Sequence, residues 1–200
     1  MGKNYDALHY VQKQMREFDP GLTNAVQRLF NIEDQSKKGQ ECVMDSVMLQ
    51  LIFRKFGIQA DIHLGEICAD GNQDACHCWL TVNDRLIDMG IYGNSNYNPY
   101  YRGPRLNHPF IMEEFSSLQN IVYADGSTET SGTWQAELSE KSVIDYIRYC
   151  PEDRVCKLVC KSLDITYNQE NRSMSCNLAE GLKFPKLKKL VVSPSGKSGE

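Results

Sequence analysis

The most hydrophobic stretch of the chain lies at residues 42–57, CVMDSVMLQLIFRKFG. Its apolar side chains cover most of a helical circumference, and Gly57 provides a C-cap. We therefore predict a central, buried helix over 42–56 that begins at Cys42. The start of a helix presents free N–H groups and partial positive charge, which favour a thiolate and can hold an oxyanion. Taken alone, however, Cys42 is better explained as one small core residue among eight cysteines.

A β-hairpin is predicted downstream of this helix. Residues 77–82 and 85–89 have the composition of strands, and only Asn83-Asp84 separates them. A two-residue loop is typical of a tight hairpin turn. It would pair Val82 with Arg85 and, counting back, Trp79 with Asp88.

This register brings His77 and Asp88 to one face of the hairpin. Successive strand residues point to opposite sides, so His77 and Trp79 share one face, and the other faces the core with Cys76, Cys78 and Leu80. Asp88 pairs with Trp79 and is the diagonal neighbour of His77, at a Cα separation of about 7–8 Å. A carboxylate there can orient an imidazole and stabilise its charged form. The alternatives are a surface histidine and a strand-ending aspartate.

Three other histidines are candidate bases. His63 lies in a predicted strand and has no evident carboxylate partner, His108 precedes Pro109 in a loop, and His9 lies on the first helix. We interpret all three as structural or peripheral.

The remaining pattern indicates an α+β fold, with a central helix packed on an antiparallel sheet and flanked by helices. Helices are predicted at 5–17, 22–31, 139–149 and 152–163, and further strands at 59–67 and around 121–123. Polar residues 34–40 predict a break after the second helix. Residues 1–182 are expected to form one domain, with a helical part at 1–33 and a catalytic core at 38–93. Residues 183–200 are expected to form a mobile basic tail.

The composition of the chain limits the classes of partner that we expect it to bind. The chain has 200 residues, 41% of them hydrophobic, and a net charge of −4, which disfavours nucleic acid. Neither a signal peptide nor a long apolar run is evident, so we expect a cytoplasmic protein without a membrane span. The eight cysteines are then expected to be reduced.

Structural zinc is the main alternative use of the cysteines. Cys76, His77, Cys78, Cys156 and Cys160 are its candidate ligands, but their spacings do not match the usual Cys-x2-Cys pairs. We therefore predict no metal and no cofactor.

Together, Cys42, His77 and Asp88 resemble the transglutaminase-like branch of papain-like cysteine enzymes. In that superfamily a cysteine opens a central helix, a histidine lies on one strand and an aspartate on the next. The residues around Cys42, the helix end at Gly57, and His77-Cys78-Trp79 particularly resemble lasso-peptide leader peptidases. Leu86-Ile-Asp88-Met-Gly90 also resembles arylamine N-acetyltransferases, although their Arg-Gly-Gly-x-Cys is absent. The likeness covers about residues 38–93.

The resemblance implies a thiol enzyme that forms an acyl-enzyme, either a peptidase or amidase or a transglutaminase-like acyltransferase, acting on a peptide or protein. A non-enzymatic protein-binding domain and a small-molecule N-acyltransferase are the alternatives. The tyrosine-rich loop at 92–109 follows Asp88, and long loops beside a rigid scaffold often carry recognition. We predict that Trp79, Tyr100 and Tyr101 bind substrate; a loop that merely covers the core is equally consistent with the sequence.

Overall fold

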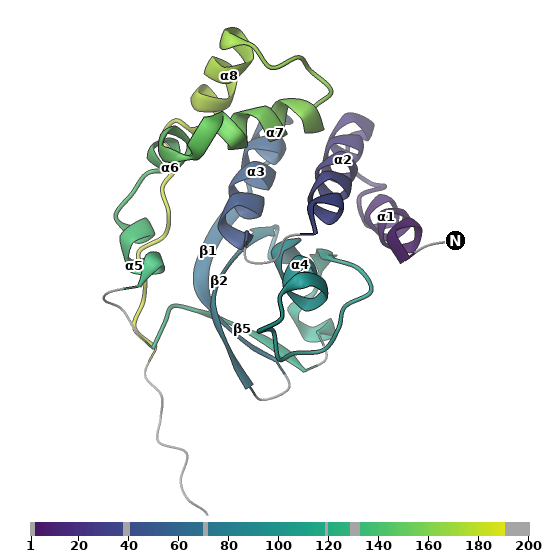
Figure 1. Ribbon diagram of the computed structural model, residues 1–200, viewed down its shortest axis with the longest axis vertical. Coiled ribbons are helices and arrows are strands. Elements are labelled where there is room, and N and C mark those ends of the chain that lie inside the picture. Colours follow the sequence, from purple (N-terminus) through teal and green to yellow (C-terminus); the bar gives the residue numbers. More distant parts are fainter. Residues whose placement is uncertain (1–2, 38–40, 70–71, 119, 129–132, 191–200) are drawn as a thin grey trace, which may run out of the picture.

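The fold is α+β, built on one five-stranded sheet (Figure 1). A computed structural model describes residues 3–37, 41–69, 72–118, 120–128 and 133–190. The strand order is β4-β3-β2-β1-β5, and all neighbouring strands are antiparallel. The strands are β1 (Asp61–Ala69), β2 (Asn72–Val82), β3 (Arg85–Asp88), β4 (Phe110–Glu113) and β5 (Ile121–Asp125).

Most helices lie above the sheet and to its sides in Figure 1, and α3 is the central one among them. Helices α1 and α2 stand on one side of α3, and α7 crosses it with α8 beyond (Figure 1). Their bounds are α1 (Lys3–Gln14), α2 (Pro20–Ser36), α3 (Cys42–Lys55), α4 (Gly90–Tyr97), α5 (Trp134–Ser139), α6 (Val143–Tyr149), α7 (Arg154–Ser162) and α8 (Gln169–Ala179). Two short 3-10 helices, η1 (Phe115–Ser117) and η2 (Pro151–Asp153), complete the described chain.

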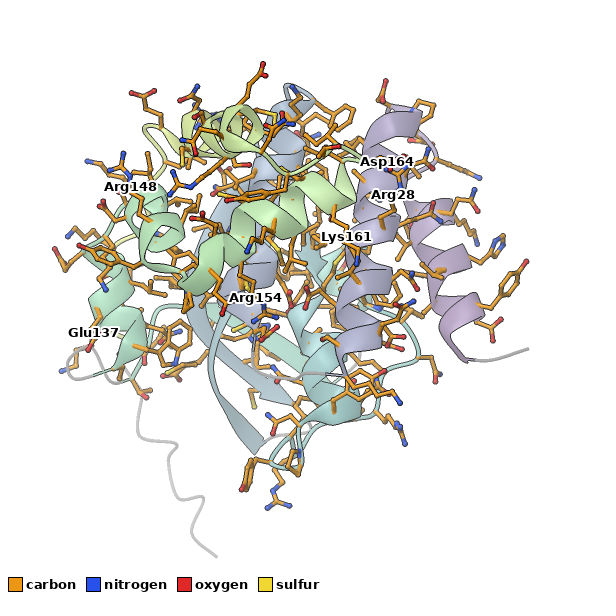
Figure 2. The ribbon with its side chains drawn as sticks, turned by 45° about the horizontal axis from the view of Figure 1, so that its top comes forward. Arg28, Glu137, Arg148, Arg154, Lys161 and Asp164 are labelled. Atoms are coloured by element: carbon orange, nitrogen blue, oxygen red, sulfur yellow. The ribbon has the colours of Figure 1, made fainter. Side chains whose placement is uncertain are left out.

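The central helix has the predicted position and length. Helix α3 begins at Cys42, and eleven of its residues are buried, so it is surrounded by protein on nearly all sides. It ends before Gly57, whose φ of +73° favours glycine. Arg28 of α2 binds the Ser162 carbonyl at 3.1 Å and Asp164 at 3.4 Å, tying α2 to the end of α7 (Figure 2).

The hairpin register is also as predicted. Val82 pairs with Arg85 and Leu80 with Ile87, around a turn in which Asn83 and Asp84 both have positive φ. Two positive φ values in sequence are typical of the type I′ turn that two-residue hairpins favour.

The sheet separates two cores. The larger one lies under the helices and includes Cys78 and Leu80. The smaller one contains Trp79 and is completed by Tyr101, Leu106 and Tyr123 from later segments. The alternation of β2 thus fixes which side chains meet the helices and which meet the segments that follow β3.

Several predicted boundaries were wrong. Helix α2 continues past the predicted end at 31, because Asp34 is buried and accepts a 2.5 Å hydrogen bond from the Tyr97 hydroxyl. The first part of the predicted loop 92–109 is helix α4, which Asp88 helps to begin: its Oδ1 accepts from the Ile91 N–H at 3.0 Å. Strand β4 and helices α5 and α8 were not predicted.

The start of the predicted tail is part of the domain. Phe184 is buried and packs edge-on against Tyr146, with ring centroids 5.8 Å apart. Ser127 donates from its N–H to the Lys188 carbonyl at 2.8 Å and accepts from the Leu190 N–H at 2.9 Å. Residues 184–190, which the sequence assigns to the tail, thus contact α6 and the end of β5, while 191–200 lie outside the described residues.

Candidate active site

Cys42 lies at the first position of α3, and only 6% of its surface is exposed. Met89-Gly90, at the start of α4, passes so close that a Cβ on Gly90 would lie 2.8 Å from the Cα and Cβ of Cys42. The preceding Glu41 makes no side-chain cap for α3; both its oxygens accept from Arg154 of α7 at 2.7 Å (Figure 2). The Glu41 side chain therefore does not cap the backbone N–H groups at the start of α3, which lie beside Cys42.

His77 lies in β2, is 1% exposed, and interacts with both other predicted site residues. Its Nε2 is 2.6 Å from Oδ2 of Asp88. Because an ionised carboxylate only accepts, Nε2–H is the donor, which leaves Nδ1 for Cys42. Burial lowers the pKa of His77, but the charges of Asp88 and Cys42 and hydrogen bonds with both outweigh it, so this pKa is raised well above its usual value.

Asp88 is 2% exposed and fully engaged as an acceptor. Besides the His77 and Ile91 bonds, its Oδ2 accepts from the Tyr123 hydroxyl at 2.7 Å. Sequence reasoning missed Tyr123, because β5 lies 35 residues further along the chain and pairs with β1.

Trp79 is placed differently from its predicted role as a wall of the substrate cleft. It is 2% exposed, and its ring lies between those of His77 and His63, stacked at centroid distances of 6.4 and 5.4 Å. The structure also gives His63 a carboxylate partner that we did not predict: Asp125, at 2.8 Å. Trp79 therefore separates two histidine–aspartate pairs, and only His77 interacts with Cys42.

A cavity of about 450 Å³ opens at Cys42 and His77. Tyr100 and Tyr101, both predicted to bind substrate, are among its lining residues, together with Asn94, Asn98 and Trp134. The five side chains carry no formal charge. The cavity therefore surrounds Cys42 and His77 with two amides, two phenols and one indole.

Helix α5 holds one edge of this cavity, and its position was not predicted. Gln135 is fully buried and donates to the carbonyls of Gly65 at 2.6 Å and His77 at 3.1 Å. These bonds join α5 to β1 and, at His77, to β2, and they place the neighbouring Trp134 in the cavity. The only sequence signal was Thr133, which caps α5 by accepting from the Ala136 N–H.

Within the part of the chain that the structure describes, no three His, Cys, Asp or Glu residues are grouped to hold a metal ion, and no disulfide joins any of the eight cysteines. In the same residues, no helix has the length and apolarity needed to cross a membrane.

Comparison with known families finds a similarity in the N-terminal half of the chain. A model of the transglutaminase-like superfamily matches residues 11–102, a range that contains Cys42, His77 and Asp88. Members of this superfamily are usually cysteine-dependent enzymes. No curated protein and no solved structure matches the chain.

Proposed function

We propose that this chain, similar to the transglutaminase-like superfamily over residues 11–102, is a cysteine-dependent enzyme that forms an acyl-enzyme on Cys42. The observation that carries the proposal is the placement of His77. It is buried, held through Nε2 by Asp88, and lines the same cavity as Cys42, which contributes to the raised pKa of His77. A core cysteine needs no such partner, whereas a nucleophile does.

In the proposed reaction, the Cys42 sulfur forms a bond to the substrate carbonyl carbon, and the backbone N–H at the start of α3 stabilises the oxyanion. The amide C–N bond then breaks, and His77 gives its proton to the leaving amine. Water or a second amine next attacks the thioester, with His77 accepting the proton of the attacking group, and Cys42 is released. Asp88 orients His77 throughout and stabilises the imidazolium.

A peptide or protein is the proposed substrate, because the site is elongated. A second cavity of about 500 Å³ shares Val43 and Trp134 with the cavity at Cys42. The cavity at Cys42 thus continues into a second one, and two adjoining cavities suit a peptide chain better than they suit a small molecule.

Selective alkylation tests the nucleophile. Cys42 should react with iodoacetamide near neutral pH before the half-buried Cys68 and Cys150, although Cys42 is more buried, because His77 beside it can accept the thiol proton. Peptide mapping after partial labelling gives the order, with Cys68→Ser as the control that should leave it unchanged. Faster reaction at Cys68 and Cys150 would remove the main support for the proposal.

Acyl trapping tests the reaction. Intact-mass analysis with a panel of peptide amides, peptide esters and small acyl thioesters should reveal one acyl adduct, lost in Cys42→Ala. We expect His77→Gln and Asp88→Asn to lower the acylation rate roughly 10²–10⁴-fold. An adduct formed only from small thioesters would favour a small-molecule N-acyltransferase. Peptide binding without any adduct would favour a non-enzymatic protein-binding domain.

A further inference from the structure

Tyr123 makes a contact with Asp88 that the proposed reaction does not yet use. Its hydroxyl donates to Oδ2 of Asp88 at 2.7 Å, and His77 Nε2 lies 2.6 Å from the same oxygen. Oδ1, the other oxygen, accepts from the backbone of Ile91. One carboxylate oxygen therefore has two donors, one of which is the proposed catalytic imidazole.

The Tyr123 ring is held from several sides, so its hydroxyl has little freedom to turn away. The backbone of Tyr123 pairs with Ile67 of β1. The ring meets Trp79 edge-on at 5.0 Å, Phe115 edge-on at 5.9 Å, and His77 at 6.2 Å. Burial, the charge of Asp88 and the hydrogen bond with it raise the pKa of Tyr123 well above its usual value, so the hydroxyl keeps its proton and remains a donor.

We propose that Tyr123 is a positioning residue, which fixes Oδ2 of Asp88 toward His77 and takes up part of the carboxylate charge. This inference rests on the proposed function. A carboxylate that is already hydrogen-bonded attracts the imidazolium proton less strongly than a bare one. Tyr123 thereby keeps His77 able to release its proton to a leaving amine, instead of holding it permanently as an imidazolium.

Other titratable groups act on the same pair. Cys42 of α3 acts electrostatically on His77, Asp45 of α3 and Cys78 of β2 act on Asp88, and Tyr101 acts on Tyr123 itself. Because Tyr123 is the hydroxyl donor on Oδ2, its effect can be separated from theirs by removing one atom.

Tyr123→Phe is the test, since it keeps the ring and removes the hydroxyl. The acylation rate of Cys42 should fall about tenfold. The upper limb of the pH–rate profile, which reports deprotonation of His77, should move to higher pH by about half a unit or more. Phe115→Leu is the matched control: it disturbs the packing of Tyr123 but keeps the hydrogen bond, so the upper limb should stay in place.

A double-mutant cycle with Asp88→Asn makes the test specific. If Tyr123 acts through the carboxylate charge, then adding Tyr123→Phe to Asp88→Asn should change the rate by less than about twofold. The inference would be overturned if the rate losses of the two substitutions multiplied in the double variant, or if the upper limb of the pH–rate profile stayed in place in Tyr123→Phe. Either result would show that Tyr123 only supports the fold. That result is distinct from a failed proposed function, in which Cys42→Ala and Asp88→Asn would leave all substrate turnover unchanged.

Discussion

Asp45 is a buried carboxylate one turn after Cys42, and the proposed mechanism does not use it. It is 6% exposed, and its Oδ1 has no hydrogen-bond partner among the described residues. Burial, followed by the negative charges of Glu33, Cys42, Glu41 and Asp88, raises the pKa of Asp45 well above its usual value. The folded protein therefore holds this proton more tightly than the unfolded chain does.

Asp45→Asn should for that reason stabilise the protein. Below about pH 4 both states are protonated, and Asp45 costs nothing. As the pH rises, the unfolded chain ionises first, so the free energy of unfolding falls until the folded pKa is passed. The variant lacks this loss, and we expect a gain on the order of 1 kcal/mol at neutral pH. Denaturant melts at pH 4 and pH 7 measure it; an equal gain at both values would contradict the electrostatic explanation.

At the scale of elements, the segment after α4 carries two adjacent tyrosines with different surroundings. Both line the cavity at Cys42, but Tyr100 is 74% exposed whereas Tyr101 packs against the smaller core with Trp79. The sequence treated the two as one recognition pair. The structure indicates that only Tyr100 can be changed without loss of packing.

Tyr100→Ala should lower kcat/KM for a peptide substrate by about three- to tenfold, because one wall of the cavity is lost. Its melting temperature and Cys42 alkylation should stay the same. Tyr101→Ala should instead cost about 2 kcal/mol of stability. Tyr5 of α1 is 61% exposed, so Tyr5→Ala is the control for both the turnover and the stability assay. Unchanged turnover in Tyr100→Ala would assign this tyrosine to the surface alone.

At the scale of the whole molecule, the segment Lys183–Leu190 connects the second half of the chain to the sheet. It joins α6 through Phe184 and the end of β5 through Lys188. Its one aromatic residue, Phe184, is buried against Tyr146 of α6. Phe184→Ala should thus lower the free energy of unfolding by about 3 kcal/mol. Thermal melts of Phe184→Ala against the unsubstituted protein would check this, and an unchanged melting temperature would contradict it.

The second cavity, which adjoins the one at Cys42, also predicts a substrate preference. Met44, Leu138 and Tyr149 give it apolar walls; of its charged lining residues, Glu41 pairs with Arg154, and Glu137 and Lys141 carry opposite charges. Peptides with a bulky apolar residue beside the reacting group should therefore acylate Cys42 about tenfold faster than peptides with alanine there. Tyr149 is 80% exposed, so Tyr149→Ser should reduce this preference without loss of stability. A peptide series that varies one residue measures it, and a flat series would argue against the apolar subsite.

The sequence by itself determined the features that depend on neighbouring residues. The continuous apolar stretch placed α3 at the centre, and the two-residue turn at Asn83-Asp84 fixed the hairpin register. Strand alternation then set His77 and Asp88 on one face. All three steps follow from helix and strand periods, which act over a few residues and are visible in any window of the chain.

Only the tertiary structure decided which distant segments complete the site. Tyr123 reaches Asp88 across 35 positions, Gln135 reaches His77 across 58, and Arg154 reaches Glu41 across 113. Trp79, expected at the cleft, is instead enclosed between two histidines by the later strands. No local pattern encodes such contacts, because the path of the intervening chain, the pairing of β5 with β1 and the packing of α5 and α7 determine them together. The candidate nucleophile and base are therefore evident from sequence, while the groups that orient them and shape the cavity emerge only on folding.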